Sequence, residues 1–514
     1  MEALDSDPVS VPPTDPLRSI ARRIGKLGLA SLALALIGLA APAIVSAHQL
    51  TGRFTSPIPL GAYLVGAALA VGVSFAILFA RGDGSPEGPD ADLAATAVAP
   101  DRTVGVPRLV RRAITVVGLL AWAWIVVQAV VLGGHSEGDV ASLFLWTYGW
   151  VGLALTSAFI GPVWTWLDPF SSLHRLAAGG MSRLGLSGGA SAPYPDRMGR
   201  WPAVVGFGVV IWLELAIPAA RSGQGLGIIL VGYTVITLIA MAQFGREPWR
   251  RNGEVFSVWF GLIGRLAPLA LPDGHDGASA PSDPRAIARL RVRTFATGLL
   301  ETDHRLASLV MVALSIGGIL YDGLSQTQIF FEGFGIPTIA EQSLLLFGWL
   351  AVVVAIALLV ARIVGSPALT AGLIPIAIGY LIAHYLTFIL FDSQRILLAL
   401  TDPLGLGGTD LLGLGAFEPG TTWLPGSVAW SLQLFSVVGG HVIGAWAGHA
   451  VYVRERVVRE RGSTSPSRRD PRLREVPLAL LMVGLTALTL WSLGQAIATQ
   501  SEAPAASIPA VVSR

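Results

Sequence analysis

Runs of about twenty consecutive apolar residues recur along the whole chain, and no other feature of the sequence restricts the fold as strongly. A helix of this length is what the hydrocarbon core of a bilayer requires, whereas β-barrel strands would alternate apolar and polar residues. Only 13% of the 514 residues are charged, which is about half the fraction expected of a soluble domain. The sequence therefore predicts an all-α, polytopic transmembrane helix bundle. Its eleven expected spans cover residues 27–47, 60–80, 113–133, 140–162, 202–220, 225–244, 304–321, 343–364, 369–391, 426–452 and 476–497.

The distribution of basic residues predicts the orientation of these spans. If the spans alternate in direction, all of the 35 lysines and arginines fall on one side of the membrane except Arg53, Arg221, Arg395 and Arg514. Cytoplasmic loops carry such an excess of basic residues. We therefore predict an N-in, C-out, multi-pass protein of the cytoplasmic (inner) membrane, surrounded by membrane lipid.

The segments between the spans differ in composition. Residues 1–17 and 82–107 are rich in Pro, Asp, Ser and Gly, which is typical of disorder. Residues 255–271 are apolar but contain Arg265 and Pro268, so we expect an interfacial or re-entrant helix there rather than a twelfth span. The expected organisation is a disordered cytoplasmic leader (1–26), a transmembrane domain (27–497) with cytoplasmic segments 81–112 and 245–303 and an outer loop 392–425, and an external tail (498–514).

The first span allows two interpretations. Basic residues precede an apolar run that ends in Val45-Ser46-Ala47, which resembles a signal-peptide cleavage site. Cleavage would make His48 the N-terminus, and a terminal amine with an imidazole chelates copper. The long polar leader favours the alternative of an uncleaved helix with His48 at its outer end.

Several kinds of chemistry are excluded by composition. The chain has no cysteine, which excludes disulfides and thiolate metal sites. Its single lysine, Lys26, lies in the leader, so neither a Schiff base nor a Walker-type phosphate loop is expected. The basic loops resemble no nucleic-acid-binding module.

The expected tenth span carries a stripe of small residues beside two histidines. Gly440, Gly444 and Gly448 recur every four residues and so lie on one helix face, which predicts a close contact with a neighbouring helix. His441 and His449 each follow a stripe glycine by one position. Both histidines are therefore expected beside this contact, where they either form hydrogen bonds between helices or bind a ligand.

The expected ninth span, within LIAHYLTFILFDSQR, carries His384 and Tyr385. Polar side chains inside a span usually face the protein interior or a cavity. Since consecutive spans are antiparallel, His384 can face His441, although their depths differ by roughly 10 Å. A divalent metal such as zinc or copper, with His48 or a carboxylate completing the ligands, is one hypothesis. A haem held by two imidazoles is the second.

Two acidic residues are further candidates for chemistry. Glu214 lies in the apolar segment FGVVIWLELAIP, where a carboxylate can bind a metal, act as a general base, relay protons or remain protonated between helices. Asp322 lies at the outer end of a span, as does Asp392. With His48 and Arg395, these two aspartates are expected around one outer vestibule.

A set of sequence blocks spanning residues 47 to 453 resembles the bacterial, mostly actinobacterial, membrane proteins known as fenitrothion hydrolases. These blocks are AHQLTGRFTSPIP, GPVWTWLDPFSSL, IWLELAIP, FGREPWRRNGEVFSVWFGLIGRLAPL, YDGLSQT, PIAIGYLIAHYLTFILFDSQ, TDPLG and GGHVIGAWAGHA. The family usually has Asn-Pro-Trp after the fourth span, where this chain has Asp168-Pro169-Phe170. A role that needs a neutral amide at this position is therefore not expected here.

The resemblance implies hydrolysis of an organophosphate triester, an apolar small molecule that reaches the site from the lipid. Within the matching blocks, the candidate metal ligands are His48, His384, His441 and His449, and the candidate catalytic residues are Glu214 and Asp322. A bound metal would activate a water molecule for attack on phosphorus. The alternative is a transporter, or a metal- or haem-handling membrane protein, that uses the same buried groups.

Overall fold

The computed structural model describes residues 60–81, 102–131, 140–185, 190–220, 223–272, 288–301, 305–404, 408–420, 423–461 and 471–494. The expected first span, the leader and the external tail lie outside these residues, as does His48. Within them the chain is almost entirely helical, which confirms the all-α prediction.

The longer helices are α2 (Leu60–Arg81), α4 (Arg108–Val131), α8 (Pro169–Arg183), α9 (Trp201–Ala216), α10 (Gly223–Phe244), α13 (Leu306–Ser325), α15 (Ile339–Val364), α16 (Ser366–Phe391), α18 (Gly426–Arg461) and α19 (Pro471–Leu493). The shorter α-helices are α5 (Val140–Ser142), α6 (Leu153–Phe159), α7 (Trp164–Leu167), α11 (Arg246–Asn252), α12 (Val255–Ile263), α14 (Gln328–Phe334) and α17 (Ile396–Thr401). A π-helix, η1, covers Leu143–Gly152, and 3-10 turns form η2 (Asp196–Met198), η3 (Pro218–Ala220), η4 (Thr297–Glu301) and η5 (Asp392–Arg395).

Among the described residues, seven helices are long and apolar enough to cross a membrane: α4, α10, α13, α15, α16 with its continuation into α17, α18 and α19. Three further apolar stretches, in α2, in η1 with α6, and in α9, are shorter. The chain is thus a multi-pass membrane protein. The predicted total of eleven spans and the predicted orientation stay predictions.

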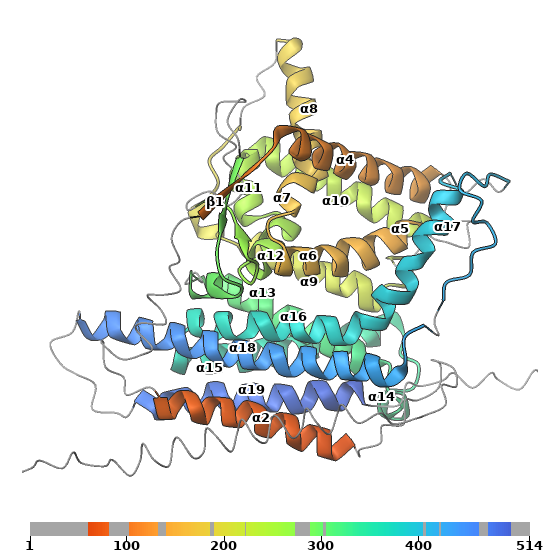
Figure 1. The fold of residues 1–514 in the computed structure, drawn as a ribbon. Coiled ribbons are helices and arrows are strands. Elements are labelled where there is room, and N and C mark those ends of the chain that lie inside the picture. Colours follow the sequence, from red (N-terminus) through yellow and green to blue (C-terminus); the bar gives the residue numbers. More distant parts are fainter. Residues whose placement is uncertain are drawn as a thin grey trace, which may run out of the picture.

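The helices lie side by side in layers, as Figure 1 shows. Helix α2 packs on α19, α18 packs on α16, and α13 lies between α16 and α9. The central helices are α13 and the first half of α16, because most of their side chains are buried on every side. Polar residues carried by these two helices are therefore held inside protein rather than in lipid.

The predicted glycine stripe is confirmed as the contact between α18 and α16. A Cβ atom added to Gly440 would lie 2.6 Å from the carbonyl oxygen of Pro375 on α16, and one added to Gly448 would lie 3.3 Å from that of Ala368. Gly444 is held as closely against the carbonyl oxygen of Gly372. Only glycine permits so close an approach of two helix backbones.

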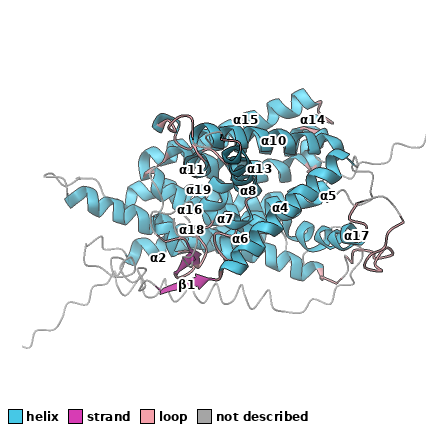
Figure 2. Cartoon of the chain, turned by 90° about the horizontal axis from the view of Figure 1, so that it is seen from above, coloured by secondary structure: helices cyan, strands magenta, loops and turns pink. Residues whose placement is uncertain are grey.

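A small sheet lies at the end of the bundle where several arginines gather, which we call the basic end. Strand β3 (Ala288–Val292) lies between β1 (Arg102–Val106) and β2 (Leu269–Ala270), and both pairings are antiparallel. Figure 2 shows these strands together beside the helices. The prediction of disorder for residues 82–107 was therefore wrong for residues 102–106, because a partner strand from a distant part of the chain satisfies their backbone.

Two other segments also differ from their predicted form. The apolar segment expected as an interfacial or re-entrant helix forms α12, whose side chains are mostly buried among neighbouring helices instead of lying on an outer surface. The expected outer loop 392–425 begins with η5 and α17, so the ninth span continues as helix beyond residue 391.

Candidate functional site

A cluster of four polar side chains lies where α9, α13 and α16 meet. Asp322 is near the end of α13 and His384 is near the end of α16. The Nε2 atom of His384 lies 2.8 Å from Oδ2 of Asp322, and the two side chains are 14% and 15% exposed. Asp322, predicted at an outer vestibule and as a candidate catalytic residue, is therefore the direct partner of His384.

Tyr385 connects this pair to a second carboxylate. Its hydroxyl donates to Oδ2 of Asp322 at 3.1 Å and lies 3.4 Å from Oε1 of Glu214 on α9. Since a hydroxyl has one proton, it donates to one carboxylate at a time. Gln326 donates from Nε2 to the other oxygen of Asp322, at 2.7 Å. The result is a hydrogen-bonded chain in the order Glu214, Tyr385, Asp322, His384.

One cavity adjoins this chain, and a second cavity shares Trp150 with the first. One of about 10 Å³ is lined by Glu214, Tyr385 and Trp150, and this volume is about that of a single water site. The other, of about 760 Å³, is lined almost entirely by apolar side chains of α4, η1, α9, α10 and α12, including Leu213 and Trp150. Trp150 thus borders both cavities, and the larger one has the size and polarity that an apolar small molecule needs.

His441 and His384 are not brought together. His441 is fully buried, and its Nδ1 donates to the carbonyl oxygen of Val437 at 2.8 Å. Within the described chain its Nε2 has no hydrogen-bond partner. The neighbouring Gly440 packs against Gly379, whereas His384 lies five residues further along α16, or roughly 7 Å. The structure keeps the two histidines at different depths, as their positions in the sequence suggested.

His449 forms a separate pair at the other end of α18. Its Nδ1 lies 2.6 Å from Oε2 of Glu475 on α19, and both side chains are buried. Glu475 was not predicted as the partner, because it lies one residue before the expected span 476–497 and next to the basic Arg474, where a carboxylate is usually solvated.

The remaining predicted vestibule residues pair with each other. Arg395 Nε lies 3.5 Å from Oδ1 of Asp392, and both side chains are largely exposed. This contact within one turn of η5 accounts for both charges without a ligand.

A metal fits the described donors only in part. Among the residues the structure describes, no group of three or more histidine, aspartate or glutamate side chains is arranged so that it could hold a metal ion. His384 and Asp322 supply two donors, whereas a zinc site takes three or four protein ligands. His48, the predicted completing ligand, lies outside the described residues, so the metal hypothesis stays a prediction.

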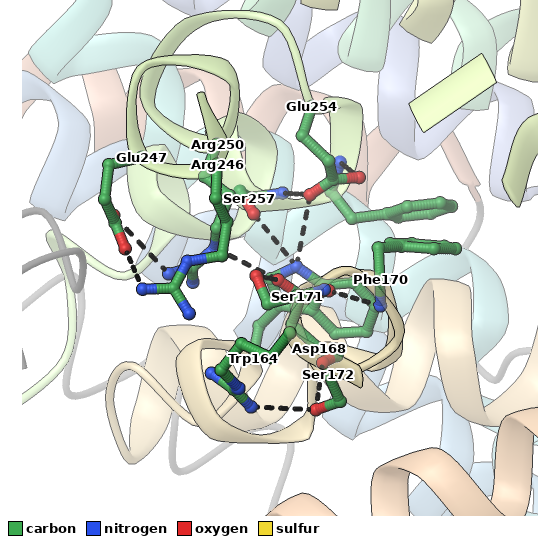
Figure 3. Close-up of polar contacts among 12 residues, drawn as sticks. Trp164, Asp168, Phe170, Ser171, Ser172, Arg246, Glu247, Arg250, Glu254 and Ser257 are labelled. Atoms are coloured by element: carbon green, nitrogen blue, oxygen red, sulfur yellow. Dashed lines mark hydrogen bonds and ion pairs between the residues drawn. The ribbon is translucent and has the colours of Figure 1, made fainter. Parts of the chain in front are cut away.

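A second buried polar cluster, which the sequence analysis missed, ties α8 to α11 (Figure 3). Asp168 is 2% exposed and caps α8 by accepting from the backbone amides of Phe170 and Ser171, at 2.9 and 3.1 Å. Its other oxygen, Oδ2, lies 3.0 Å from Nε of Arg250. Aspartate followed by proline is a typical helix start, so the sequence did hold a signal for this role.

Glu254 completes this cluster at the start of α12. It is fully buried and accepts from the amides of Phe256 and Ser257, at 3.1 and 2.6 Å. It also accepts from the hydroxyl of Tyr233 at 2.6 Å and from Nε1 of Trp164 at 3.3 Å. The cluster therefore fastens α7, α8, α10, α11 and α12 to one another, and its polar groups are occupied by structural contacts.

Comparison of the chain with protein-family models, with curated proteins and with solved structures finds no match. The site geometry, together with the resemblance described above, is therefore what supports a functional proposal.

Proposed function

We propose that the protein hydrolyses an apolar ester within the membrane, with organophosphate triesters as the substrate class that the sequence resemblance suggests. The observation that carries the proposal is the contact of 2.8 Å between His384 and Asp322. A carboxylate that accepts from one ring nitrogen fixes the tautomer and makes the other nitrogen the basic one. His384 is thereby prepared to act as a general base.

The proposed step is direct attack by water. Nδ1 of His384 takes a proton from a water molecule while the water oxygen bonds to phosphorus and the bond to the leaving oxygen breaks. Asp322 stabilises the imidazolium that forms, and Tyr385 and Gln326 hold the two oxygens of Asp322 in place. His384 then gives its proton to the leaving group. In this proposal, a lipid-soluble substrate enters the apolar cavity beside Trp150, which also borders the small cavity at Glu214 and Tyr385.

The test measures release of nitrophenol from a nitrophenyl phosphotriester by the full-length protein in lipid nanodiscs. We expect His384→Gln and Asp322→Asn each to lower the rate by roughly 10²–10⁴-fold, the usual contribution of a general base. His449→Gln is the matched control, because it alters another buried histidine–carboxylate pair far from the site. A wild-type rate in folded His384→Gln protein would refute the mechanism.

A second candidate, proton-coupled transport, is favoured by one observation. The chain from Glu214 through Tyr385 to Asp322 and His384 links titratable groups of three helices, which is how proton relays are built in membrane proteins. Transport predicts solute-dependent proton uptake into vesicles that Tyr385→Phe abolishes, with no hydrolysis in detergent. Hydrolysis predicts turnover in detergent without any gradient.

Three finer expectations belong to this proposal. The chain crosses the cytoplasmic membrane eleven times with its N-terminus inside, so the His384 site opens toward the outer face; accessibility of single introduced cysteines to an impermeant reagent tests this topology. A divalent metal held by His384 and completed by His48 is tested by elemental analysis. Zinc or copper that is lost in a His384→Ala/His441→Ala variant would support the metal, and metal content unchanged by the variant would contradict it.

A further inference from the structure

A cavity of about 300 Å³ lies at the basic end of the bundle, remote from the His384 site. Arg200, which lines it, precedes α9, and Glu214 lies near the end of the same helix. The two residues are fourteen positions apart, which corresponds to roughly 21 Å along a helix. The walls come from α6, α7, α11, α12, the segment that follows α12, strands β2 and β3, and η4.

The lining of this cavity is strongly cationic. It contains one carboxylate, Glu301, and six arginines, so it carries five net positive charges; the arginines are Arg200, Arg250, Arg251, Arg265, Arg291 and Arg293. Like charges confined in so small a volume repel one another, and burial weakens their solvation. An arrangement of this kind is favourable only when anions compensate it.

The protein itself supplies part of this compensation. Arg291 lies 2.6 Å and Arg293 lies 3.7 Å from the carboxylate of Glu301. Arg250 is paired with Asp168 behind the wall of the cavity. These three arginines are thus held in place by carboxylates.

Arg251 and Arg265 lack such a partner. Arg265 donates to the backbone carbonyl of Glu301 and has no carboxylate partner in the described chain. For Arg251 the described residues provide no ion pair and no hydrogen bond, and its Nε is buried. Ser157 adds an uncharged donor, since it is 1% exposed and its hydroxyl has no partner in the same part of the chain. The cavity therefore contains unused donors of two kinds.

Arginines that only determine topology would not need this arrangement. Such residues act by remaining in the cytoplasm, where water solvates each of them separately. Here they converge on one cavity that residues of β2 and β3 help to line. Convergence of guanidinium groups on one space is typical of recognition of phosphate, which accepts paired hydrogen bonds from each group.

We propose that this cavity binds a phosphate group, carried either by a membrane lipid headgroup or by a soluble phosphate compound. Two charges on a phosphate monoester compensate a large part of the excess that the protein leaves unpaired. A volume of about 300 Å³ is at the lower end for small-molecule sites, so it suits a phosphorylated headgroup or small metabolite better than a large cofactor. This inference does not depend on the proposed hydrolysis.

The experiment uses the full-length protein and two kinds of probe. Glycerol 3-phosphate and inorganic phosphate are titrated calorimetrically into protein in detergent, and the thermal midpoint is compared in nanodiscs with and without phosphatidate. Arg251→Gln is the test variant, because loss of an unpaired side chain leaves the packing intact. Arg246→Gln is the matched control, because Arg246 lies on the same helix, is paired with Glu247 and does not line the cavity.

We expect Arg251→Gln to weaken phosphate binding about tenfold or more, as loss of a hydrogen bond to a charged group does, and Arg246→Gln to change it less than twofold. Binding of the soluble probes assigns the site to a soluble phosphate compound. A midpoint that rises only with phosphatidate, and not in Arg251→Gln, assigns it to a lipid headgroup. No binding of any probe to folded protein, or equal losses in the two variants, would overturn the proposal.

Discussion

Replacing Asp168 by asparagine separates the two roles of this carboxylate. Asparagine is as good a helix cap as aspartate, so its side-chain oxygen keeps the bonds to the amides of Phe170 and Ser171. Its amide nitrogen takes the place of Oδ2 and then faces the guanidinium of Arg250, 3.0 Å away in the wild type. The N–H groups of the asparagine amide and of the Arg250 guanidinium would then face each other in place of the ion pair between Asp168 and Arg250.

The burial of Asp168 and Arg250 determines how much stability the substitution Asp168→Asn should remove. The side chains of Asp168 and Arg250 are 0% and 6% exposed, so water solvates the remaining arginine only weakly. Breaking a buried ion pair by removing one partner typically costs about 3–5 kcal/mol. Of the other groups near this guanidinium, Glu247 lies at 4.0 Å and is partly exposed, so it replaces little of the loss.

The assay is unfolding in mixed micelles, followed by helical circular dichroism. Asp410→Asn is the matched control, because Asp410 also accepts from two backbone amides but is exposed and has no arginine partner among the described residues; it should change stability little. The double variant Asp168→Asn/Arg250→Met should recover part of the loss, since no charge then remains unpaired. If Asp168→Asn unfolds like the wild type, the pair does not stabilise the fold and our reasoning fails.

Further predictions concern the helix contact and pH. Gly440→Ala should destabilise the protein by about 1–3 kcal/mol, because the added methyl meets a carbonyl oxygen of α16 at 2.6 Å; Gly439→Ala, with open space at its Cβ, should not. Unfolding midpoints of the two variants decide this. Burial, followed by the charges of Arg246 and Arg175, lowers the pKa of His174 in α8 below 6.5. The folded state therefore favours neutral His174. The contribution of this neutral side chain to the stability of the fold is complete above pH 6.5, and it is lost as the pH falls through the lowered pKa of His174 in the folded protein. Stability should decline there in the wild type and less in His174→Gln; identical pH profiles would contradict it.

The long helices were predictable because their signal is local. Composition alone placed spans at 225–244 and 343–364, and the structure has helices Gly223–Phe244 and Ile339–Val364 there. The short polar helices and the sheet were not predicted, because their stability depends on partners. Strand β1 is five residues long and mostly exposed, and among the described strands its backbone pairs with β3 alone.

The residues of the candidate site could be predicted from the sequence, but the contacts between them could not. His384 and Asp322 could be chosen because polar groups in apolar segments are costly. That they bond to each other depends on how α13 packs on α16, and no local pattern encodes that contact. Glu254 gave no signal at all, because glutamate is not among the preferred helix caps.

The pairing of β1 with β3 has a consequence for biogenesis. Strand β1 leaves the ribosome before the membrane helices α4 and α10 are made, and β3 follows only after both. Until then, Arg200 and Arg250 belong to separate segments of the unfinished chain. Once β3 docks, the same side chains become the wall of one cavity. The cavity is therefore completed only when β3 is in place, and because β3 must close a long loop, we expect its docking to be a late step of folding.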